Sequence, residues 1–479
     1  MSELPVTQSR NGEILNSEPH IFDPVILRAY DIRGEVGVNL GENDAVALGR
    51  AFGTFIRNKG GQNVCIGYDG RLSSPQLAEA TIHGLLSTGI DVENIGLGPT
   101  PMLYFSVKDR MADGGIMITG SHNPPSHNGF KLTLSGGPVF GEAVQELGKI
   151  AESGSFAKGK GLLKDYSVQD SYIKRLLKDL NLARPLKIAW DPGNGVAGNV
   201  LQELVKQMPG EHILLNEKVD GNFPAHHPDP TVDENLKELR NAVLDNTCDM
   251  GIAFDGDGDR IGVLDSNGNV IRGDTLLTIY AREILETNPG SPIIGDIKCS
   301  QVFLDEIKRL GGKPVLWKTG HSLIKNKLAE LQSPLAGELS GHIFFADKYY
   351  GFDDALYCSI RLMNEVAMFE KGLSEITAHM PRLFNTPEFR IDIDEDRKFG
   401  FIDDIGSFLK DNISEDAEII DIDGIRMNLQ NGWVLIRASN TQNVISLRME
   451  AKSEEALNEI KGLVKIGFDK FGLPLNNIW

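Results

Sequence analysis

The chain has 479 residues, which is too long for a single hydrophobic core and indicates roughly three or four domains. Its hydrophobic content of 41% and charged content of 24% are typical of a soluble globular protein. A net charge of −19 argues against general binding to nucleic acid or to an anionic membrane, although a locally basic pocket can still bind a small anion.

The cellular location is indicated by three further features. No apolar run is long enough to span a bilayer, and the first 20 residues lack the apolar core of a signal peptide. The cysteines lie far apart without a paired spacing, which predicts reduced thiols rather than a disulfide framework or a zinc site. We therefore expect a cytoplasmic protein whose partners are small molecules, with no nucleic acid and no membrane among them.

A unit of strand, aspartate, loop, helix, turn and strand recurs three times along the chain. Its first strand, which ends in Asp each time, is predicted at 64–69, 186–191 and 292–296. Its second strand is predicted at 92–97, 212–215 and 314–317. Because strands that alternate with helices build a sheet covered by helices, we predict three related α/β domains with mixed sheets flanked by helices.

The C-terminal part has a different pattern. Residues Phe389–Asp394 alternate like a half-buried strand, and a final helix is predicted over 453–471. Further strands are predicted near 418–421, 433–437 and 444–450. This predicts a separate C-terminal α+β domain. The expected domains are residues 1–166, 167–269, 270–384 and 385–479.

A serine lies in the loop Gly120–Pro125, between an apolar strand and a strand at 130–134. The neighbouring Ser121 and His122 suggest a hydrolase, but a nucleophile elbow needs a helix directly after the serine. The two prolines disfavour that helix, and neighbouring side chains in an extended loop are expected to point apart. We predict instead that Ser121 carries a transferable phosphoryl group, whose charge His122 and Lys131 offset.

An acidic loop, F-D-G-D-G-D-R at 254–260, separates two further apolar strands. Its three aspartates, at every second position, point to one side, and the glycines let them converge. Oxygen ligands suit Mg²⁺, with Mn²⁺ or Ca²⁺ as alternatives. An EF-hand is excluded because Arg260 replaces its glycine and Ser266 its glutamate. The predicted metal ligands are Asp255, Asp257, Asp259 and the phosphorylated Ser121.

A glycine-rich loop offers a different interpretation. Gly193–Gly198 fits G-x-G-x-x-G after a strand and before a helix, and Glu217 lies about twenty residues further on. This pattern allows a nicotinamide- or flavin-dependent oxidoreductase, but it leaves the serine and acidic loops unexplained. A second alternative is a sugar-phosphate-binding regulator without turnover, against which the complete set of motifs argues.

Four motifs occur in order: T-G-S-H-N-P at 119–124, D-G-D-G-D-R at 255–260, G-E-L-S-G-H at 337–342 and R-A-S-N-T at 437–441. Together they resemble the α-D-phosphohexomutase family, most closely its bacterial phosphomannomutase/phosphoglucomutase branch, from about residue 22 to the C-terminus. The resemblance implies four domains around a central cleft. It also implies a mutase that interconverts hexose 1-phosphate and hexose 6-phosphate through a phosphoserine and a 1,6-bisphosphate.

The resemblance further implies Mg²⁺ as cofactor, glucose 1,6-bisphosphate as activator, and a role for each motif residue. A monomer is expected, although the sequence itself does not give the oligomeric state. Ser121 is the implied phosphoserine, and Arg260 steadies its loop. Lys131 and His342 are the candidate general bases. The implied substrate contacts are Tyr30, Arg33, Lys298, His321, Glu338, Ser340, His342, Arg437, Ser439, Asn440 and Thr441.

Two positions depart from the family pattern. Asn443 stands where many relatives have Pro, and Leu339 stands where Met is common. The first changes the stiffness of the phosphate loop, and the second is a mild exchange. The preference among mannose, glucose and N-acetylglucosamine phosphates stays open. A hinge near 380–390 is expected, because the bisphosphate must turn end for end.

Overall fold

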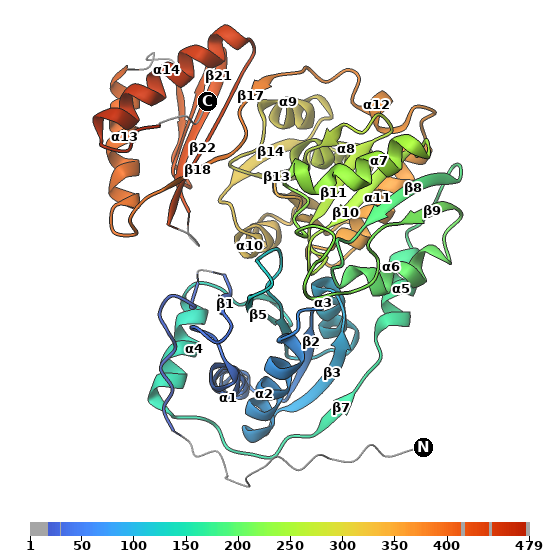
Figure 1. The fold of residues 1–479 in the computed structure, drawn as a ribbon, viewed down its shortest axis with the longest axis vertical. Coiled ribbons are helices and arrows are strands. Elements are labelled where there is room, and N and C mark those ends of the chain that lie inside the picture. The colour runs from blue at the N-terminus through green and yellow to red at the C-terminus, as the bar shows by residue number, and fades with distance from the viewer. Residues whose placement is uncertain (1–17, 29, 413–416, 440–442, 476–479) are drawn as a thin grey trace.

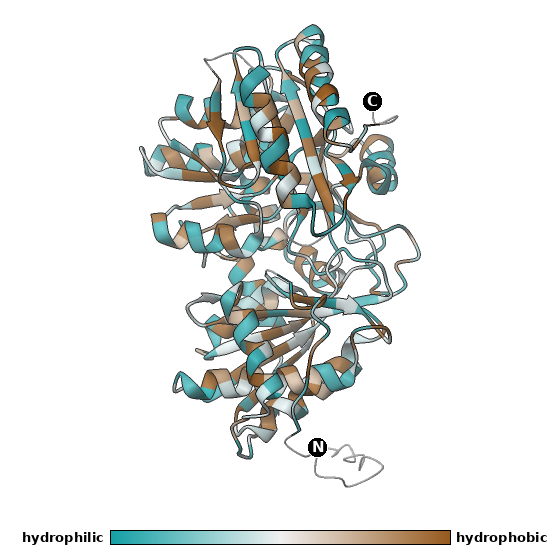
Figure 2. Cartoon of the chain, turned by 90° about the vertical axis from the view of Figure 1, so that its left-hand side faces the viewer, coloured by the Kyte–Doolittle hydropathy of each residue, from teal (hydrophilic) through white to brown (hydrophobic). Residues whose placement is uncertain are grey.

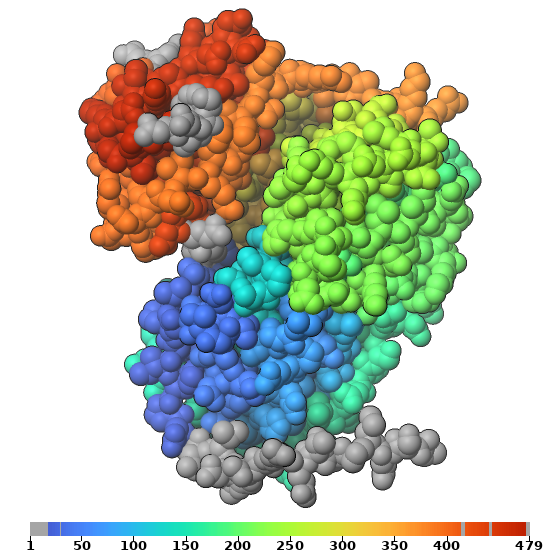
Figure 3. Space-filling view, in the orientation of Figure 1, coloured from blue at the N-terminus to red at the C-terminus, as the bar shows by residue number. Residues whose placement is uncertain are grey.

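Four sheets follow one another along the chain in the computed structural model, which describes residues 18–28, 30–412, 417–439 and 443–475 (Figure 1). They have seven, five, four and six strands. The first three sheets are mixed and flanked by helices, and the last belongs to a C-terminal α+β domain. The predicted fold class is therefore confirmed. Figure 3 shows that the surface is hollowed between the fourth domain, in orange and red, and the second, in green.

The first domain contains the seven-stranded sheet. Its strands are β1 (Ile32–Glu35), β2 (Asn63–Tyr68), β3 (Asp91–Leu97), β4 (Gly114–Ile118), β5 (His127–Leu134), β6 (Gly137–Pro138) and β7 (Leu163–Asp165). Its helices are α1 (Glu42–Asn58), α2 (Ser74–Ser87), α3 (Thr100–Asp109) and α4 (Glu142–Ser153). Helices α1 and α2 pack so closely that a Cβ atom at Gly49 would lie 2.3 Å from the Thr81 carbonyl oxygen. This close approach therefore requires glycine.

The second and third domains follow with shorter sheets. The second contains α5 (Gln169–Leu177), β8 (Leu186–Asp191), α6 (Ala197–Val205), β9 (Gly210–Leu214), a 3₁₀ turn (Asp233–Leu236), α7 (Lys237–Asp245), β10 (Met250–Phe254), β11 (Ile261–Asp265) and β12 (Val270–Ile271). The third contains α8 (Gly273–Thr287), β13 (Pro292–Asp296), α9 (Gln301–Arg309), β14 (Lys313–Trp317), α10 (His321–Leu331), β15 (Leu335–Gly337), β16 (Ile343–Phe345), α11 (Ala355–Ala367) and α12 (Gly372–Ile376).

The three sheets share one topology, as the threefold sequence repeat predicted. A central strand pairs in parallel with two neighbours: β2 with β3 and β4, β8 with β9 and β10, and β13 with β14 and β15. The last parallel strand then pairs with an antiparallel strand that follows it directly: β4 with β5, β10 with β11, and β15 with β16. The loop that joins this parallel strand to its antiparallel partner therefore lies at the same place in each of the three domains.

The fourth domain has an antiparallel sheet covered by two helices. Its elements are β17 (Phe384–Asn385), β18 (Phe389–Asp392), α13 (Lys398–Asn412), β19 (Glu418–Ile420), β20 (Ile425–Leu429), β21 (Gly432–Ala438), β22 (Val444–Ala451) and α14 (Glu454–Lys470). Helix α13 and strand β20 were not predicted. Two glycines weaken the helical pattern of α13, and β20 is short, with polar residues among its apolar ones.

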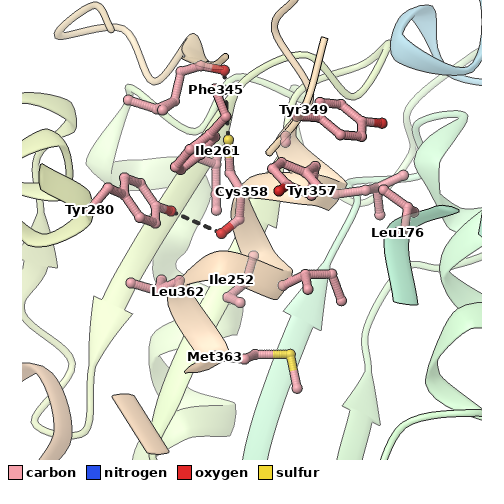
Figure 4. Close-up of a cluster of buried hydrophobic side chains, with 14 of the residues drawn as sticks. Leu176, Ile252, Ile261, Tyr280, Phe345, Tyr349, Tyr357, Cys358, Leu362 and Met363 are labelled. Atoms are coloured by element: carbon pink, nitrogen blue, oxygen red, sulfur yellow. Dashed lines mark hydrogen bonds between the residues drawn. The ribbon is translucent and has the colours of Figure 1, made fainter. Parts of the chain in front are cut away.

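The core explains how the domains are joined. The largest cluster of buried apolar residues runs through the first three domains. Figure 4 shows its centre, where the hydroxyl of Tyr280 donates to the carbonyl oxygen of Cys358 at 3.0 Å. The fourth domain has a core of its own. A small cluster of Ile297, Trp433 and Leu435 joins it to the third domain. Domains one to three thus form a continuous body, to which the fourth is attached by a smaller apolar contact.

Surface patterning agrees with this layering. Figure 2 shows apolar residues along the strands and a mixture of apolar and polar positions on the helices that cover them. Of the helices within the described ranges, none combines the length and the apolar composition that crossing a bilayer requires.

Candidate active site

The four motifs occupy equivalent places in the fold. The T-G-S-H-N-P motif (the serine loop) connects β4 to β5, and the D-G-D-G-D-R motif (the acidic loop) connects β10 to β11. The G-E-L-S-G-H motif connects β15 to β16, and the R-A-S-N-T motif begins at the end of β21 and leads toward β22. The serine and acidic loops are in direct contact, because Ser121 Oγ donates to Asp255 Oδ2 at 3.0 Å. A side chain at Gly256 would lie 2.4 Å from the carbonyl oxygen of Ser121, so this approach requires glycine.

Ser121 lies in a turn and not at the start of a helix, as the prolines predicted. One expectation about this loop was wrong: the side chains of Ser121 and His122 do not point apart. Ser121 Oγ lies 3.2 Å from His122 Nδ1, because Ser121 has φ = 50° and the loop is not extended there. Burial, and secondly Arg260, lower the pKa of His122 well below its ordinary value.

The loop is held by an arginine that the motifs did not single out. The buried guanidinium of Arg71 pairs with Asp69, at 3.1 Å between Nε and Oδ2. It donates to the backbone carbonyls of Ser121, Asn123, Pro124 and His127 at 2.6–3.0 Å. Asp69 in turn accepts from the hydroxyl of Thr119. The only sequence sign of this role was the strand-ending aspartate followed by Gly70 and Arg71.

The three aspartates of the acidic loop form a buried cluster. All three are fully buried, and one carboxylate oxygen from each lies within 4.8 Å of the others. Burial, with the charges of Asp257 and Asp259, raises the pKa of Asp255 well above its ordinary value. Thr100, at the start of α3, donates to Asp257 Oδ2 at 2.5 Å, a contact that the sequence did not predict.

These carboxylates fit a hard divalent cation. Asp257 Oδ1 and Asp259 Oδ1 are buried and accept no hydrogen bond from the part of the chain that the structure describes. The ammonium of Lys131 partly neutralises the cluster: it lies 2.7 Å from Asp257 Oδ2 and also contacts Asp259 Oδ2. Burial alone would lower the pKa of Lys131, but Asp257 and Asp259 raise it well above its ordinary value. Unpartnered buried oxygens are what a bound Mg²⁺ would use.

The glycine-rich loop of the second domain supports the acidic loop. The backbone N–H of Val196 donates to the carbonyl oxygen of Gly256 at 3.1 Å, and a side chain at Gly195 would lie 3.0 Å from the same oxygen. A side chain at Gly198 would lie 2.1 Å from the carbonyl oxygen of Glu217. These glycines therefore serve close backbone packing, and this accounts for the G-x-G-x-x-G pattern without a dinucleotide.

The third domain contributes a carboxylate and two stacked histidines. Glu338 is buried and accepts from the backbone N–H of Gly320 at 2.5 Å, and burial raises its pKa. Ser340 lies half-buried in the same loop. The rings of His321 and His342 stack with centroids 5.5 Å apart. Burial, and secondly Lys325, lower the pKa of His321 to about 4.

Residues from three domains meet around these histidines. The ring of Tyr30 from the first domain lies edge-on to His321, with centroids 6.3 Å apart, and its hydroxyl donates to the Thr319 carbonyl oxygen at 3.3 Å. The structure places Arg260 of the second domain against His342, where Nε donates to Nε2 at 3.0 Å. Arg33 pairs with Asp31 and reaches Asn123 Oδ1 of the serine loop at 3.4 Å.

The fourth domain supplies carboxylates that pair with two of the expected substrate-binding cations. Arg437 Nε lies 3.0 Å from Asp423 Oδ2, and Lys298 Nζ lies 3.2 Å from Glu388 Oε2. Burial alone would lower the pKa of both cations, but these carboxylates raise it. The carbonyl oxygen of Ser439 accepts from Lys398 at 2.9 Å. Asn440 and Thr441 lie outside the described residues.

Comparison with known proteins agrees with this arrangement. Models of the phosphoglucomutase/phosphomannomutase domains match the chain at 24–158 (α/β/α domain I), 170–268 (domain II), 272–384 (domain III) and 390–465 (C-terminal domain). A phosphomannomutase/phosphoglucomutase from Pseudomonas aeruginosa is 42% identical over 436 residues, which cover 91% of this chain and 94% of the relative. A phosphoglucomutase from Neisseria gonorrhoeae is 40% identical over 443 residues, with coverages of 92% and 96%.

A solved structure is also similar. The crystal structure of a phosphoglucomutase/phosphomannomutase family protein from Burkholderia thailandensis matches with a TM-score of 0.89 at 40% identity. The match covers 94% of this chain and 98% of that one. Since four domain models match in order and this identity extends over most of the chain, the chain belongs to the phosphoglucomutase/phosphomannomutase family.

Proposed function

We propose that this protein is a mutase that interconverts hexose 1-phosphate and hexose 6-phosphate, with mannose, glucose or both as the sugar. The observation that carries the proposal is the contact between Ser121 Oγ and Asp255, at the edge of a buried triad of carboxylates. A serine in that place can carry a phosphoryl group beside a cation. The family membership and the names of the relatives support the same reaction.

The reaction begins from phospho-Ser121. The P–Oγ bond breaks while a new P–O bond forms to the free hydroxyl of the sugar phosphate, which loses its proton to a base. The released Ser121 Oγ takes up a proton from water, while the proton of the sugar hydroxyl stays on the base, and the product is a bound 1,6-bisphosphate. The bisphosphate turns end for end, and the second half-reaction reverses each step with the other phosphate. Ser121 is rephosphorylated, and no nucleotide is consumed.

The metal ligands in this proposal are Asp255, Asp257, Asp259 and the phosphoryl oxygens on Ser121. Bound Mg²⁺ would neutralise charge that develops on the transferring group. Arg260 would add a further positive charge close to this group. Of the two candidate bases, Lys131 pairs with Asp257 and Asp259, whereas His342 Nε2 accepts from Arg260 and forms no ion pair with a carboxylate of the described residues. We therefore assign His342 as the base.

Substrate recognition in this proposal divides between two ends of the site. Glu338 and Ser340 bind sugar hydroxyls, since a carboxylate accepts two hydroxyl hydrogen bonds. The non-reacting phosphate is bound by cations and donors, because a guanidinium fork matches phosphate oxygens. The proposed phosphate contacts are Lys298, Arg437, Ser439, Asn440 and Thr441. Tyr30, Arg33 and His321 complete the proposed substrate contacts. We also propose the domain boundaries that the sequence predicts.

The end-for-end turn needs room. The fourth domain is attached through a smaller contact than the others, so we propose that it opens on a hinge near 380–390. A monomeric, cytoplasmic enzyme with glucose 1,6-bisphosphate as its activator completes the proposal. An escaped bisphosphate would leave Ser121 unphosphorylated, and added bisphosphate would restore it.

The test is a coupled assay with Mg²⁺ and a trace of glucose 1,6-bisphosphate, with mannose 1-phosphate and glucose 1-phosphate compared at equal concentration. Ser121→Ala should lose nearly all turnover. Ser126→Ala is the matched control, because Ser126 lies exposed in the same loop. Near-normal turnover in Ser121→Ala would refute the phosphoserine mechanism. No conversion of either sugar phosphate by the wild type would refute the proposed substrates.

A further inference from the structure

A carboxylate outside all four motifs faces both histidines of the site. Asp353 lies just before α11, is fully buried, and is anchored by a backbone bridge to Phe344. Its Oδ2 lies 3.0 Å from His342 Nδ1 and 3.4 Å from His321 Nδ1. Its Oδ1 accepts from Lys325 Nζ at 2.9 Å. One carboxylate thus connects an ammonium group with the two rings.

The charge of Asp353 is supported by its surroundings. Burial alone would raise the pKa of this carboxyl, but Lys325 and the two histidines lower it well below its ordinary value. Lys325 is itself buried, and its ammonium lies over the ring of Tyr104, 4.5 Å from the centroid. Asp353 is therefore an anion with a cation of its own, and this arrangement keeps a negative charge beside His342.

The second nitrogen of His342 determines the tautomer. Its Nε2 accepts from Arg260 Nε at 3.0 Å, and a guanidinium can only donate. Nε2 must therefore hold a lone pair, so that the proton of the neutral ring is on Nδ1, the nitrogen that faces Asp353. Two carboxylate oxygens face Nδ1: Asp353 Oδ2 at 3.0 Å and Asp259 Oδ1 at 3.6 Å. Asp353 is therefore the nearer acceptor for the Nδ1 proton.

We propose that Asp353 is a positioning residue for the reaction: it holds His342 in the Nδ1–H tautomer, with the Nε2 lone pair available to the reacting hydroxyl. This inference rests on the proposed function, in which His342 is the base. When the sugar hydroxyl displaces Arg260 at Nε2, its O–H bond breaks, its proton moves to Nε2, and its oxygen forms the new bond to phosphorus. The carboxylate of Asp353 stabilises the imidazolium, which returns the proton to the sugar oxygen in the second half-reaction.

The variant that tests this role is Asp353→Asn, which keeps the size of the side chain. The amide can donate to Nδ1, so it favours the Nε2–H tautomer and removes the lone pair from the reacting side. We expect kcat to fall by about 100-fold or more, as for other histidines that lose their orienting carboxylate. KM should change less than kcat, because Asp353 reaches the substrate only through His321 and His342.

Asp354→Asn is the matched control. Asp354 is the next residue and is equally buried, but its carboxylate accepts from the hydroxyls of Tyr172 and Tyr349 and caps α11. This variant should change stability and leave kcat within about twofold of the wild type. An equal loss of kcat in both variants would assign the effect to packing and overturn the inference, as would full activity in Asp353→Asn.

A second readout does not depend on turnover. ¹⁵N NMR of labelled protein reports the histidine tautomer, and the His342 signal is identified by its loss in His342→Gln. The wild type should show a neutral Nδ1–H ring and Asp353→Asn the Nε2–H form. An Nε2–H ring in the wild type would overturn the inference even if Asp353→Asn fails to fold. Failure of the proposed function is distinguishable, since it would appear as absent turnover in the wild type.

Discussion

Arg71 is the side chain on which the shape of the serine loop depends most directly. Its guanidinium is 1% exposed and uses all of its N–H groups. Four of them reach backbone carbonyls and the fifth reaches a carboxylate: the acceptors are Ser121, Asn123, Pro124, His127 and Asp69. These carbonyls belong to the turn that keeps Ser121 in its left-handed conformation, so a loss of donors should release the turn.

Arg71→Lys replaces five donors by three and keeps the charge. At least two acceptors then lose their partner, at a cost of about 1–3 kcal/mol for a buried one such as the Ser121 carbonyl oxygen and less for the part-buried ones. The free energy of unfolding should therefore fall by roughly 1–4 kcal/mol, out of the 5–15 kcal/mol that is usual for a folded protein. Turnover should fall as well, because Ser121 would no longer be held against Asp255.

Urea unfolding gives the change in stability, and the coupled mutase assay gives the change in kcat. Arg57→Lys is the matched control: Arg57 is exposed and donates to the Thr88 carbonyl oxygen at 3.0 Å, so its loss should cost less than about 1 kcal/mol. Arg71→Lys with stability within about 0.5 kcal/mol of the wild type and unchanged kcat would refute this reasoning.

Three further changes test other parts of the site and the core. Asp257→Asn should abolish the rise in Tm that Mg²⁺ gives the wild type over an EDTA control, since it removes a ligand; a retained rise would contradict the metal site. Glu388→Gln should tighten the binding of inorganic phosphate about fivefold, because Lys298 loses the carboxylate of Glu388 as its ion-pair partner. An unchanged Kd for phosphate in calorimetry would contradict this prediction. Burial raises the pKa of Glu365 from 4.5 to about 7, so the wild type loses stability as pH rises between these two values. In urea unfolding, the stability of Glu365→Gln relative to the wild type should therefore rise between about pH 4.5 and about pH 7 and level off above about pH 8; a difference that stays constant over this range would contradict the prediction.

Much of the fold could be predicted from local patterns. The strand-ending aspartates at 69, 191 and 296 and the apolar strands around them revealed three related units, because a buried strand needs a continuous apolar run. The strand over Met250–Phe254 was predicted with the observed ends. Helix α13 could not be predicted in the same way, since its glycines oppose helix formation and its packing on the sheet outweighs them.

The candidate site also has features that the sequence predicted and features that it could not predict. The chemistry of the serine and acidic loops is local, because a few neighbouring residues determine which ligands they offer. Arg71 and Thr100 could not be assigned, since they act on residues that lie 50 and 157 positions away in the chain. The contact of Ser121 with His122 was missed because it depends on the left-handed φ of Ser121, which Arg71 supports from outside the motif and Thr119 from within it.

Residue order alone was enough to identify the repeated domains, the four loops and the ligands that each loop offers, because these depend on backbone periodicity and side-chain chemistry. Tertiary structure decided which of these groups act on one another. The orientation of His342 illustrates this: Arg260 of the second domain and Asp353 of the third set the roles of its two nitrogens. No local pattern encodes that choice, since it arises only when donors and acceptors from distant segments are buried together and must satisfy one another.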